Sequence, residues 1–318
     1  MTLFEILDEI SVGYHQDDEE SNNLKKYVKN VVEVLSEEGA IYENRKIQMS
    51  ALSDSIDSNL EGDTFLQGSY GTNTAIKHKM YDVDADIAFI IENDAIDLNI
   101  RDLIYNKIYN AFNDKYFVQK KKPCITIDFK NKYKIDVAIY TKVGNKIYFH
   151  NSIDGYEKVD DAKPKDLIKY FNACYVNNNT RRKVIRLIKH FLKTTNIALD
   201  IEECNRIPSI AVNLLLCERI MTENANEEQL YEDTLKSIKY IRSYVEANGF
   251  NGPEKNELCV GNTFYKVKDI SDLKRVLDRI IIMFEKKQYS EIIENDIYTK
   301  INERNSNRFT GNFTGTMG

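Results

Sequence analysis

Three kinds of feature are scarce in this sequence of 318 residues. No apolar run approaches the roughly 18–20 residues that a membrane-spanning helix needs, so we expect no membrane partner. The first five residues carry an acid where a secretory leader needs a basic start and an apolar run. There is no basic excess either: 44 basic against 50 acidic residues give a formal net charge of −6. This balance argues against a bulk cationic nucleic-acid binder, although a local basic groove is compatible with it.

Paired cysteines and clustered histidines are also missing. The five cysteines are scattered and form no C-x-x-C pair: Cys124, Cys174, Cys204, Cys217 and Cys259. An odd, scattered set is typical of reduced, mostly buried thiols in a cytoplasmic protein, and it argues against a disulfide framework. The four histidines are far apart and are expected at the surface or on helices: His15, His78, His150 and His190. The sequence therefore predicts no zinc site.

The pattern of apolar residues changes twice along the chain. Residues 1–60 have helical spacing with breaks near Gly13 and Gly39, and apolar residues between 47 and 60 predict a long helix that backs a sheet. Short β-branched and aromatic runs at 84–91, 124–129, 133–140 and 146–149 predict strands, with a helix over 97–113. An antiparallel sheet with helices against one face is the most economical arrangement of these elements.

From Pro164 onward the spacing is mainly helical. Helices are predicted at 164–175, 180–194, 207–222, 226–247 and 270–294, with a break at 248–253. Residues 302–318 are polar and contain glycine without apolar periodicity, which is typical of disorder. We therefore predict an α+β protein with a sheet lobe over 1–162, a helical lobe over 163–300 and a disordered tail over 301–318.

One segment before the first long strand carries the chemistry. Gly68-Ser69 opens a loop in which backbone N–H groups can approach a phosphate, with the Ser69 hydroxyl as an added donor. Asp82, Asp84 and Asp86 follow at alternate positions, so a strand would project them from one face. Carboxylates that converge in this way suit Mg²⁺ or Mn²⁺, which pair protein oxygens with substrate phosphates. A later strand supplies one more carboxylate, Asp136, for a site that holds two metal ions.

Two choices stay open within this set. The first metal-binding pair is Asp82/Asp84 by its short spacing from Ser69, or Asp84/Asp86 by its position directly before the apolar strand. We prefer Asp82 and Asp84, with Asp86 orienting the ligands. Asp128 competes with Asp136 for the third position, and Asp136 is preferred because Ile135 and Val137 flank it in a strand that should lie centrally. Taken singly, each motif is also common in turns and at solvated sheet edges.

The whole set resembles the signature of the DNA polymerase β-type nucleotidyltransferase superfamily. The runs Gly68-Ser69-Tyr70-Gly71-Thr72-Asn73-Thr74 and Tyr81-Asp82-Val83-Asp84-Ala85 look most like the CD-NTases, the bacterial cGAS/DncV-like nucleotidyltransferases of CBASS anti-phage defence. The resemblance implies a long N-terminal helix, a nucleotidyltransferase sheet and a C-terminal helical lobe. It also implies that Lys189 and Ser209 contact the triphosphate. The helix spacing agrees, since Arg182, Arg186, Lys189 and Lys193 form one basic stripe beside a buried apolar stripe.

The resemblance implies a cyclic oligonucleotide synthase that uses ATP, GTP or other nucleoside triphosphates. Asp82, Asp84 and Asp136 would hold the metal ions, while Gly68, Ser69, Lys189 and Ser209 would hold the donor triphosphate. The alternatives are a linear or tRNA nucleotidyltransferase and a non-catalytic, antitoxin-like nucleotide-binding protein. The lack of a zinc element argues against activation by duplex DNA. The terminal glycine, Gly318, suggests conjugation by a ubiquitin-type activating enzyme; a Gly318→Glu variant that still formed a conjugate would end that hypothesis.

Overall fold

The computed structural model describes residues 1–11, 19–43, 64–78, 83–129, 133–153, 156–176 and 178–289. Its contacts divide the chain into two compact units. The sheet unit comprises Ser11–Cys174 with Lys255–Val260, and the helical unit comprises Met1–Ile10, Tyr175–Glu254 and Gly261–Gly318. The division expected at residue 162/163 assigns residues 1–10 to the sheet, whereas their contacts join them to the helical unit. The reason is that α1 (Leu3–Ile10) packs against α6 (Asn179–Ala198) and α8 (Glu227–Asn248) with its apolar side buried.

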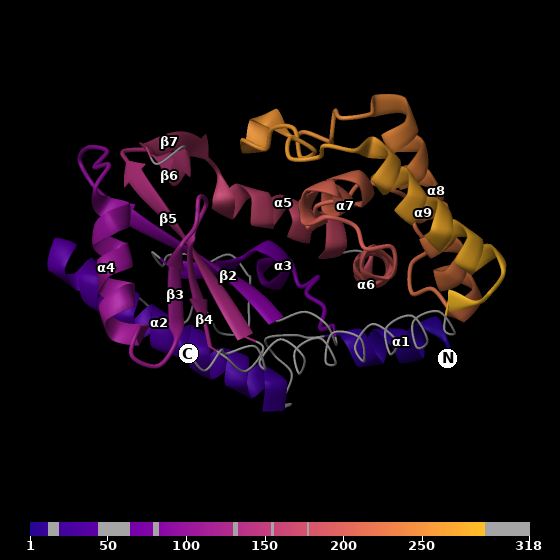
Figure 1. The fold of residues 1–318 in the computed structure, drawn as a ribbon, viewed down its shortest axis with the longest axis horizontal. Helices are drawn as coiled ribbons and strands as arrows, with labels where there is room; N and C mark the ends of the chain where they lie inside the picture. Colours follow the sequence, from indigo (N-terminus) through magenta and orange to yellow (C-terminus); the bar gives the residue numbers. More distant parts are fainter. Residues whose placement is uncertain are drawn as a thin grey trace, which may run out of the picture. The chain divides into compact units, whose positions relative to one another are not determined.

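The sheet unit contains a mixed seven-stranded sheet among the described residues (Figure 1). Its strands are β1 (Thr64–Gln67), β2 (Val83–Glu92), β3 (Phe117–Lys120), β4 (Ile125–Asp128), β5 (Tyr133–Val143), β6 (Lys146–Ile153) and β7 (Tyr156–Ala162). The order is β1-β2-β5-β4-β3, with β6 on β5 and β7 on β6. The expected sheet was mixed or antiparallel, and it is mixed: β2 and β5 are parallel, and the other strand pairs are antiparallel. The chain between them passes through α4, β3 and β4 and so returns in the same direction.

Helices α2 (Glu19–Glu43) and α4 (Ile100–Phe112) pack on one face of this sheet (Figure 1). Alternate strand residues face them, and Tyr27 of α2 stacks on Phe129 with ring centroids 4.3 Å apart. The predicted helix break at Gly39 is wrong, because α2 continues to Glu43. The predicted helix over residues 47–60 lies outside the described residues.

The opposite face of β2 and β5 carries a smaller apolar cluster. Ala88 and Ile90 of β2 join Ala138 and Tyr140 of β5, and Ile168 of α5 (Pro164–Val176) packs on them. Side chains alternate across a strand, so the even-numbered residues that precede this cluster lie on the same face. Those residues are the candidate carboxylates.

The helical unit is built from α1, α6 (Asn179–Ala198), α7 (Ser209–Leu216), α8 (Glu227–Asn248) and α9 (Ile270–Glu285), with a short 3₁₀ turn at Glu203–Asn205. A second 3₁₀ turn, Asn256–Leu258, belongs to the sheet unit. A capping box between Asn226 and Gln229 begins α8. Two predicted helices are too long: α7 stops at Leu216, and α9 stops at Glu285, just before Lys287 takes a positive φ of 54°. No described helix has the length and apolarity to cross a bilayer. The tail over 301–318, with Gly318, lies outside the described residues.

Together these elements match the predicted fold class. The chain has a mixed sheet with helices on one face, and a separate set of helices follows it. The prediction of an α+β protein with a helical C-terminal region is therefore confirmed.

Candidate functional site

Four side chains lie across the sheet at one register position, which we call the acidic rung. Gln67 of β1 pairs with Asp86 of β2, Asp86 with Asp136 of β5, and Asp136 with Thr126 of β4. The two carboxylates therefore occupy neighbouring parallel strands, whose backbones are about 4.8 Å apart. The Thr126 hydroxyl donates to Asp136 Oδ1 at 2.5 Å. Asp136 is thus oriented by a hydrogen bond and faces a second acid.

Gly68 lies directly against this rung. It has a left-handed φ of 59°, and a Cβ built on it would lie 2.9 Å from Cγ of Asp86. Any other residue would be strained there and would also displace the Asp86 carboxylate. The sequence predicted that glycine would allow close approach of a phosphate, and in this structure it also makes room for an acid.

The loop after Gly68 is held by its own hydrogen bonds. The Thr72 hydroxyl donates to the carbonyl oxygen of Gly68 at 2.9 Å, and the Thr74 amide donates to that of Ser69 at 2.8 Å. Ser69 stays partly exposed within the short helix α3 (Gly68–Gly71). The turn therefore presents Gly68 and Ser69 at the surface of the sheet unit while its threonines point inward.

A second set of residues lies one step nearer the strand starts. Asp84 pairs with Lys134 across β2 and β5, and Lys134 pairs with Asp128 across β5 and β4. The Nζ atom of Lys134 is 4.0 Å from Asp128 Oδ2. Asp84 is exposed. Asp128 pairs with Lys134 in the strand register, whereas Asp136 pairs directly with Asp86, which is consistent with the choice of Asp136 as the third carboxylate.

The two candidate acid pairs, Asp82/Asp84 and Asp84/Asp86, differ in whether they include Asp82. Asp82 lies outside the described residues, whereas Asp84 and Asp86 share the face that carries Asp136. Among the residues that the structure describes, no three His, Cys, Asp or Glu side chains form a metal-binding group. Mg²⁺ commonly uses only one or two carboxylates together with substrate phosphates, so the Asp86–Asp136 pair fits its chemistry. Because Asp82 is not described, the choice between the Asp82/Asp84 and Asp84/Asp86 pairs stays open.

The negative charge of Asp136 acts on the ionisable groups beside it. Burial, followed by the Asp136 charge, raises the pKa of the Cys124 thiol to about 12. Lys121 supplies a cation nearby, with its Nζ 4.0 Å from Asp136 Oδ1. Cys124 is therefore a neutral thiol near neutral pH, and it offers no nucleophile to the site.

A cavity of about 490 Å³ opens beside Gly68 within the sheet unit. Tyr140 and Phe149 form an aromatic wall, with ring centroids 5.2 Å apart. The Tyr140 hydroxyl donates to Gln67 Oε1 at 3.0 Å, and burial raises the pKa of Tyr140, so it remains a neutral donor. Asp160 and Asp161 add acceptors to the lining. The cavity is in the size range of small-molecule sites and combines an aromatic wall with polar groups.

The two remaining predicted contacts belong to the helical unit. Lys189 lies on α6 and is only 5% exposed, and Ser209 is the exposed first residue of α7. The predicted buried stripe of α6 is confirmed, since all five of its members are buried: Val184, Ile185, Ile188, Phe191 and Leu192. On the basic stripe, burial lowers the pKa of Arg182, and burial followed by the Arg182 charge lowers that of Arg186. These cations are therefore partly removed from water, which strengthens any contact with an anion.

The sequence missed several neighbours of the site. Thr126, Gln67 and Lys134 come close to the acids only through strand pairing. No local signal marks them, because the parallel register of β2 and β5 depends on a long connection. Two histidines also differ from expectation: His78 and His150 are buried, and His150 Nε2 lies 2.6 Å from the Thr141 hydroxyl.

Comparisons with known proteins show what this chain is similar to. Residues 63–140 match the family described as the nucleotidyltransferase domain of cyclic GMP-AMP synthase DncV-like proteins. The cyclic GMP-AMP synthase of Escherichia albertii is 27% identical over 186 residues, which cover 55% of this chain. The match spans 40% of that relative, so less than half of its length is represented. The matched family segment contains Gly68, Asp84, Asp86 and Asp136.

Solved structures share the fold. The DncV cyclic AMP-GMP synthase of Vibrio cholerae, described as a prokaryotic cGAS homolog, has a TM-score of 0.66 and 15% identity, over 92% of this chain and 93% of that one. Its complex with the linear intermediate 5′ pppA(3′,5′)pG has a TM-score of 0.63 and 17% identity, over 88% and 87%. Identities this low establish the fold alone. Residues 63–140 are therefore similar to the nucleotidyltransferase domain of DncV-like proteins, and the chain shares the fold of the DncV structures.

Proposed function

We propose that this protein is a metal-dependent nucleotidyltransferase that makes a cyclic oligonucleotide from ATP, GTP or other nucleoside triphosphates. One observation carries the proposal: Asp86 and Asp136 are neighbours in the acidic rung, and Gly68 lies against Asp86. Adjacent acids on strands that otherwise form a core are costly unless a cation offsets their charge. The family to which residues 63–140 belong supports the same chemistry.

The residues proposed to hold Mg²⁺ or Mn²⁺ are Asp84, Asp86 and Asp136, and Asp82 remains a candidate by sequence. When bound, such ions polarise the phosphoryl oxygens and stabilise the charge that develops on the leaving group. Gly68 and Ser69 contribute backbone and hydroxyl donors to the triphosphate, and Lys189 and Ser209 are proposed to contribute from the helical unit. The aromatic wall formed by Tyr140 and Phe149 suits a nucleobase.

The proposed reaction is an in-line displacement at the α-phosphorus. An acceptor ribose oxygen forms a bond to this phosphorus, its proton passes to Asp136, and the bond to pyrophosphate breaks. Thr126 keeps Asp136 oriented by donating to one of its oxygens, which leaves the other carboxylate oxygen for the proton. A second displacement within the linear product closes the ring.

The test is incubation of the purified protein with the four ribonucleoside triphosphates and Mg²⁺ or Mn²⁺. Products are treated with phosphatase and identified by mass, beside an Asp86→Asn/Asp136→Asn control. We expect phosphatase-resistant cyclic products that the control does not form. Linear products alone would replace the proposal with a linear nucleotidyltransferase. Metal-independent nucleotide binding without any product would favour a non-catalytic, antitoxin-like protein.

We also propose that the product acts as a cytoplasmic second messenger in CBASS anti-phage defence, as the family resemblance implies. The expected result is that bacteria carrying this protein with its neighbouring genes resist phage, and that the Asp86→Asn/Asp136→Asn variant removes the resistance. Equal resistance in the variant would contradict this role while leaving the enzymatic proposal intact.

A further inference from the structure

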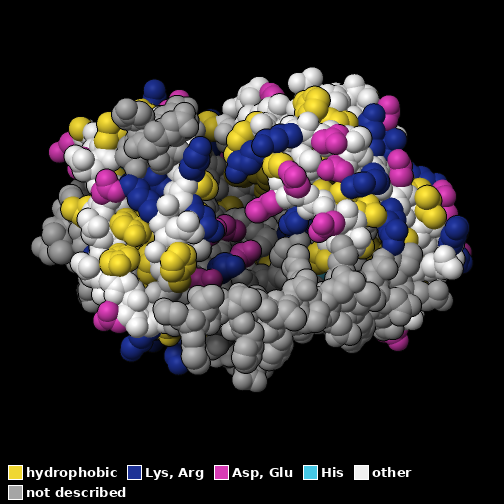
Figure 2. Space-filling view, in the orientation of Figure 1, with side chains coloured by type: hydrophobic (Ala, Val, Ile, Leu, Met, Phe, Trp, Pro, Cys, Tyr) yellow, Lys and Arg dark blue, Asp and Glu magenta, His cyan; other side chains and the backbone are white. Residues whose placement is uncertain are grey.

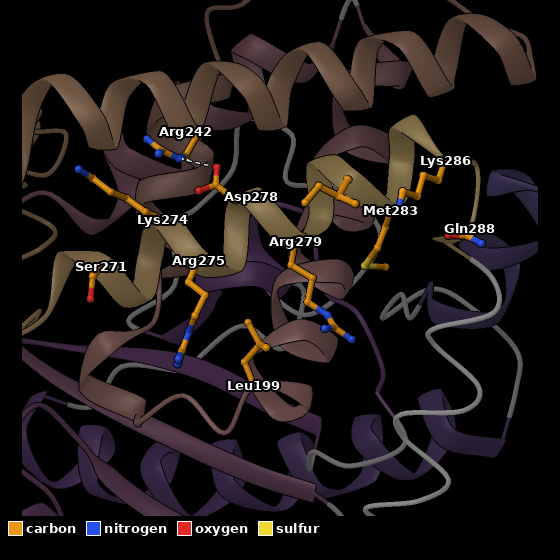
Figure 3. Close-up of a pocket in the computed structure, with 11 residues that line it drawn as sticks. Leu199, Arg242, Ser271, Lys274, Arg275, Asp278, Arg279, Met283, Lys286 and Gln288 are labelled. Atoms are coloured by element: carbon orange, nitrogen blue, oxygen red, sulfur yellow. Dashed lines mark hydrogen bonds and ion pairs between the residues drawn. The ribbon is translucent and has the colours of Figure 1, made fainter.

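A cavity of about 700 Å³ lies beside α9 in the helical unit, and most of the cations that line it have partners. Figure 2 shows basic and acidic side chains interspersed over α8 and α9 on the visible face. Arg242 donates to Asp278 at 2.7 Å, as the dashed line in Figure 3 marks, and Lys274 is 2.9 Å from Glu246. Arg279 also has a partner. This mixture is typical of a solvated surface, so we place no ligand there.

The cavity of about 490 Å³ in the sheet unit is lined by a neutral side chain with donors to spare. Gln67 lines this cavity directly before Gly68, and the proposed reaction assigns it no role. Its Oε1 atom accepts from the Tyr140 hydroxyl at 3.0 Å. Among the residues that the structure describes, none accepts a hydrogen bond from its Nε2 group. Gln67 therefore has two N–H donors for a molecule in the cavity.

Tyr140 determines how the Gln67 amide is oriented. Burial raises the pKa of Tyr140, so its hydroxyl stays protonated and donates to Gln67. Because this bond holds the amide oxygen, the amide nitrogen is turned away from the tyrosine. The ring of Tyr140 is itself fixed, since it is buried in the apolar cluster with Ala138 and Ile168. The orientation of Gln67 thus depends on a side chain that packing holds in place.

The groups at this cavity follow the order of the parts of a nucleotide. Tyr140 and Phe149 form the aromatic wall that suits a base. Gly68 and Ser69 offer the donors that suit phosphates. Gln67 is bonded to Tyr140 and directly precedes Gly68, so it connects the wall to the phosphate loop. The ribose of a nucleotide lies between its base and its phosphates, and it would therefore lie beside Gln67.

We propose that Gln67 donates a hydrogen bond to a ribose hydroxyl of the bound nucleotide and so selects ribonucleotides over deoxyribonucleotides. This inference rests on the proposed function, because it takes the bound molecule to be a nucleotide. A deoxy sugar would leave the amide donor of Gln67 unpaired in a partly enclosed site, which costs binding free energy. Sites built to hydrogen-bond a hydroxyl reject analogues that lack it. Tyr140 is a positioning residue, since it acts through Gln67.

The test measures binding to the full chain by calorimetry in the presence of Mg²⁺. A nonhydrolysable ATP analogue is compared with its 2′-deoxy and 3′-deoxy counterparts, which identify the hydroxyl that is recognised. We expect the ribonucleotide to bind at least about tenfold more tightly than one of the two deoxy compounds. Gln67→Met removes the amide and keeps the length of the side chain, so it should lower this ratio to about twofold or less. Tyr140→Phe should also lower the ratio, because the amide loses its anchor while the aromatic ring stays.

A matched control removes a glutamine amide elsewhere in the same sheet. Gln119 is exposed on β3 and does not line the cavity, so Gln119→Met should leave the ratio unchanged. Tyr140→Phe supplies a second variant if Gln67→Met fails to fold. The inference is overturned if the unaltered chain binds all three compounds alike, or if Gln67→Met weakens their binding equally. It is also overturned if the control lowers the ratio as much.

The same titration separates this inference from the proposed function. Equal affinities in a protein that forms cyclic products would overturn the inference alone. A protein that selects the ribonucleotide through Gln67 but forms no product would overturn the nucleotidyltransferase proposal alone. Absence of any nucleotide binding would overturn both.

Discussion

The two units concentrate charge of opposite sign by different means. In the sheet unit, Asp86 and Asp136 become neighbours because β2 and β5 are parallel and in register. In the helical unit, Arg275 and Arg279 become neighbours because a helix repeats every three to four residues. Acids that converge need a counterion, so the arrangement in the sheet unit calls for a cation. In the helical unit an acid lies beside the arginines, since Arg275 is 2.9 Å from Asp272.

The variant with the largest expected effect tests whether Asp86 binds the metal ion or only lies beside the residues that do. Asp86→Asn removes a charge from the acidic rung and keeps the side chain's shape, so metal binding should fail. Since mutation of mere supporting residues often costs 10–100-fold, we expect at least about a hundredfold loss of nucleotide incorporation. The control is Asp128→Asn, on the same face but beside Lys134, which should lose less than about threefold. Equal losses in the two variants would contradict the assignment.

Alanine variants at two glycines separate the effect of backbone strain on stability from the effect of the site's geometry on activity. Gly68 and Gly144 have φ values of 59° and 58°, but only at Gly68 would a Cβ meet another side chain. Each alanine variant should lower the free energy of unfolding by about 1–2 kcal/mol, because both backbones are left-handed. Only Gly68→Ala should lose activity, by about tenfold or more, since it displaces Asp86. Denaturant melts and rate assays on both variants check this, and comparable activity losses would exclude the proposed close approach.

Thr126 offers a smaller test of the same rung. Thr126→Val removes the hydroxyl that donates to Asp136, so the carboxylate should lose its orientation. We expect about a tenfold loss in kcat with little change in KM, and Thr126→Ser should restore most of it. If valine left kcat unchanged, Asp136 would not depend on this hydrogen bond.

The smallest effect on activity is expected in the helical unit. Asn205 Oδ1 accepts from the amides of Lys268 and Asp269, just before α9, and its Nδ2 donates to Asp272 at 2.9 Å. Asn205→Ala should lower the free energy of unfolding by about 1–3 kcal/mol, because buried amides lose their partner. Asn248 is exposed, so the Asn248→Ala variant should change the free energy of unfolding far less. A large loss of metal-dependent turnover in Asn205→Ala would show that the two units are coupled.

The sequence predicted the candidate acids but not their neighbours. Asp82, Asp84 and Asp136 were proposed as metal ligands, with Asp86 only orienting them, because acids at alternate positions before an apolar strand project from one face. Thr126 and Gln67 were not predicted, since strand order and register come from distant pairing.

The fold was predicted better than its details. Element types were right along most of the described chain, since the apolar spacing of β2, β5 and α8 is clear. The break expected at Gly39 failed because one glycine costs a helix only about 1 kcal/mol, which packing of α2 offsets. The parallel β2–β5 pair was missed because strand direction leaves no trace in local spacing.

The most direct test of the central claim is the effect of Mg²⁺ on nucleotide affinity. A nonhydrolysable ATP analogue is titrated against the full chain with and without Mg²⁺. We predict that Mg²⁺ strengthens binding by about tenfold or more, and that adding Asp86→Asn/Asp136→Asn abolishes this gain. An affinity that Mg²⁺ does not change, or a full Mg²⁺ effect in the variant without these carboxylates, would contradict the account.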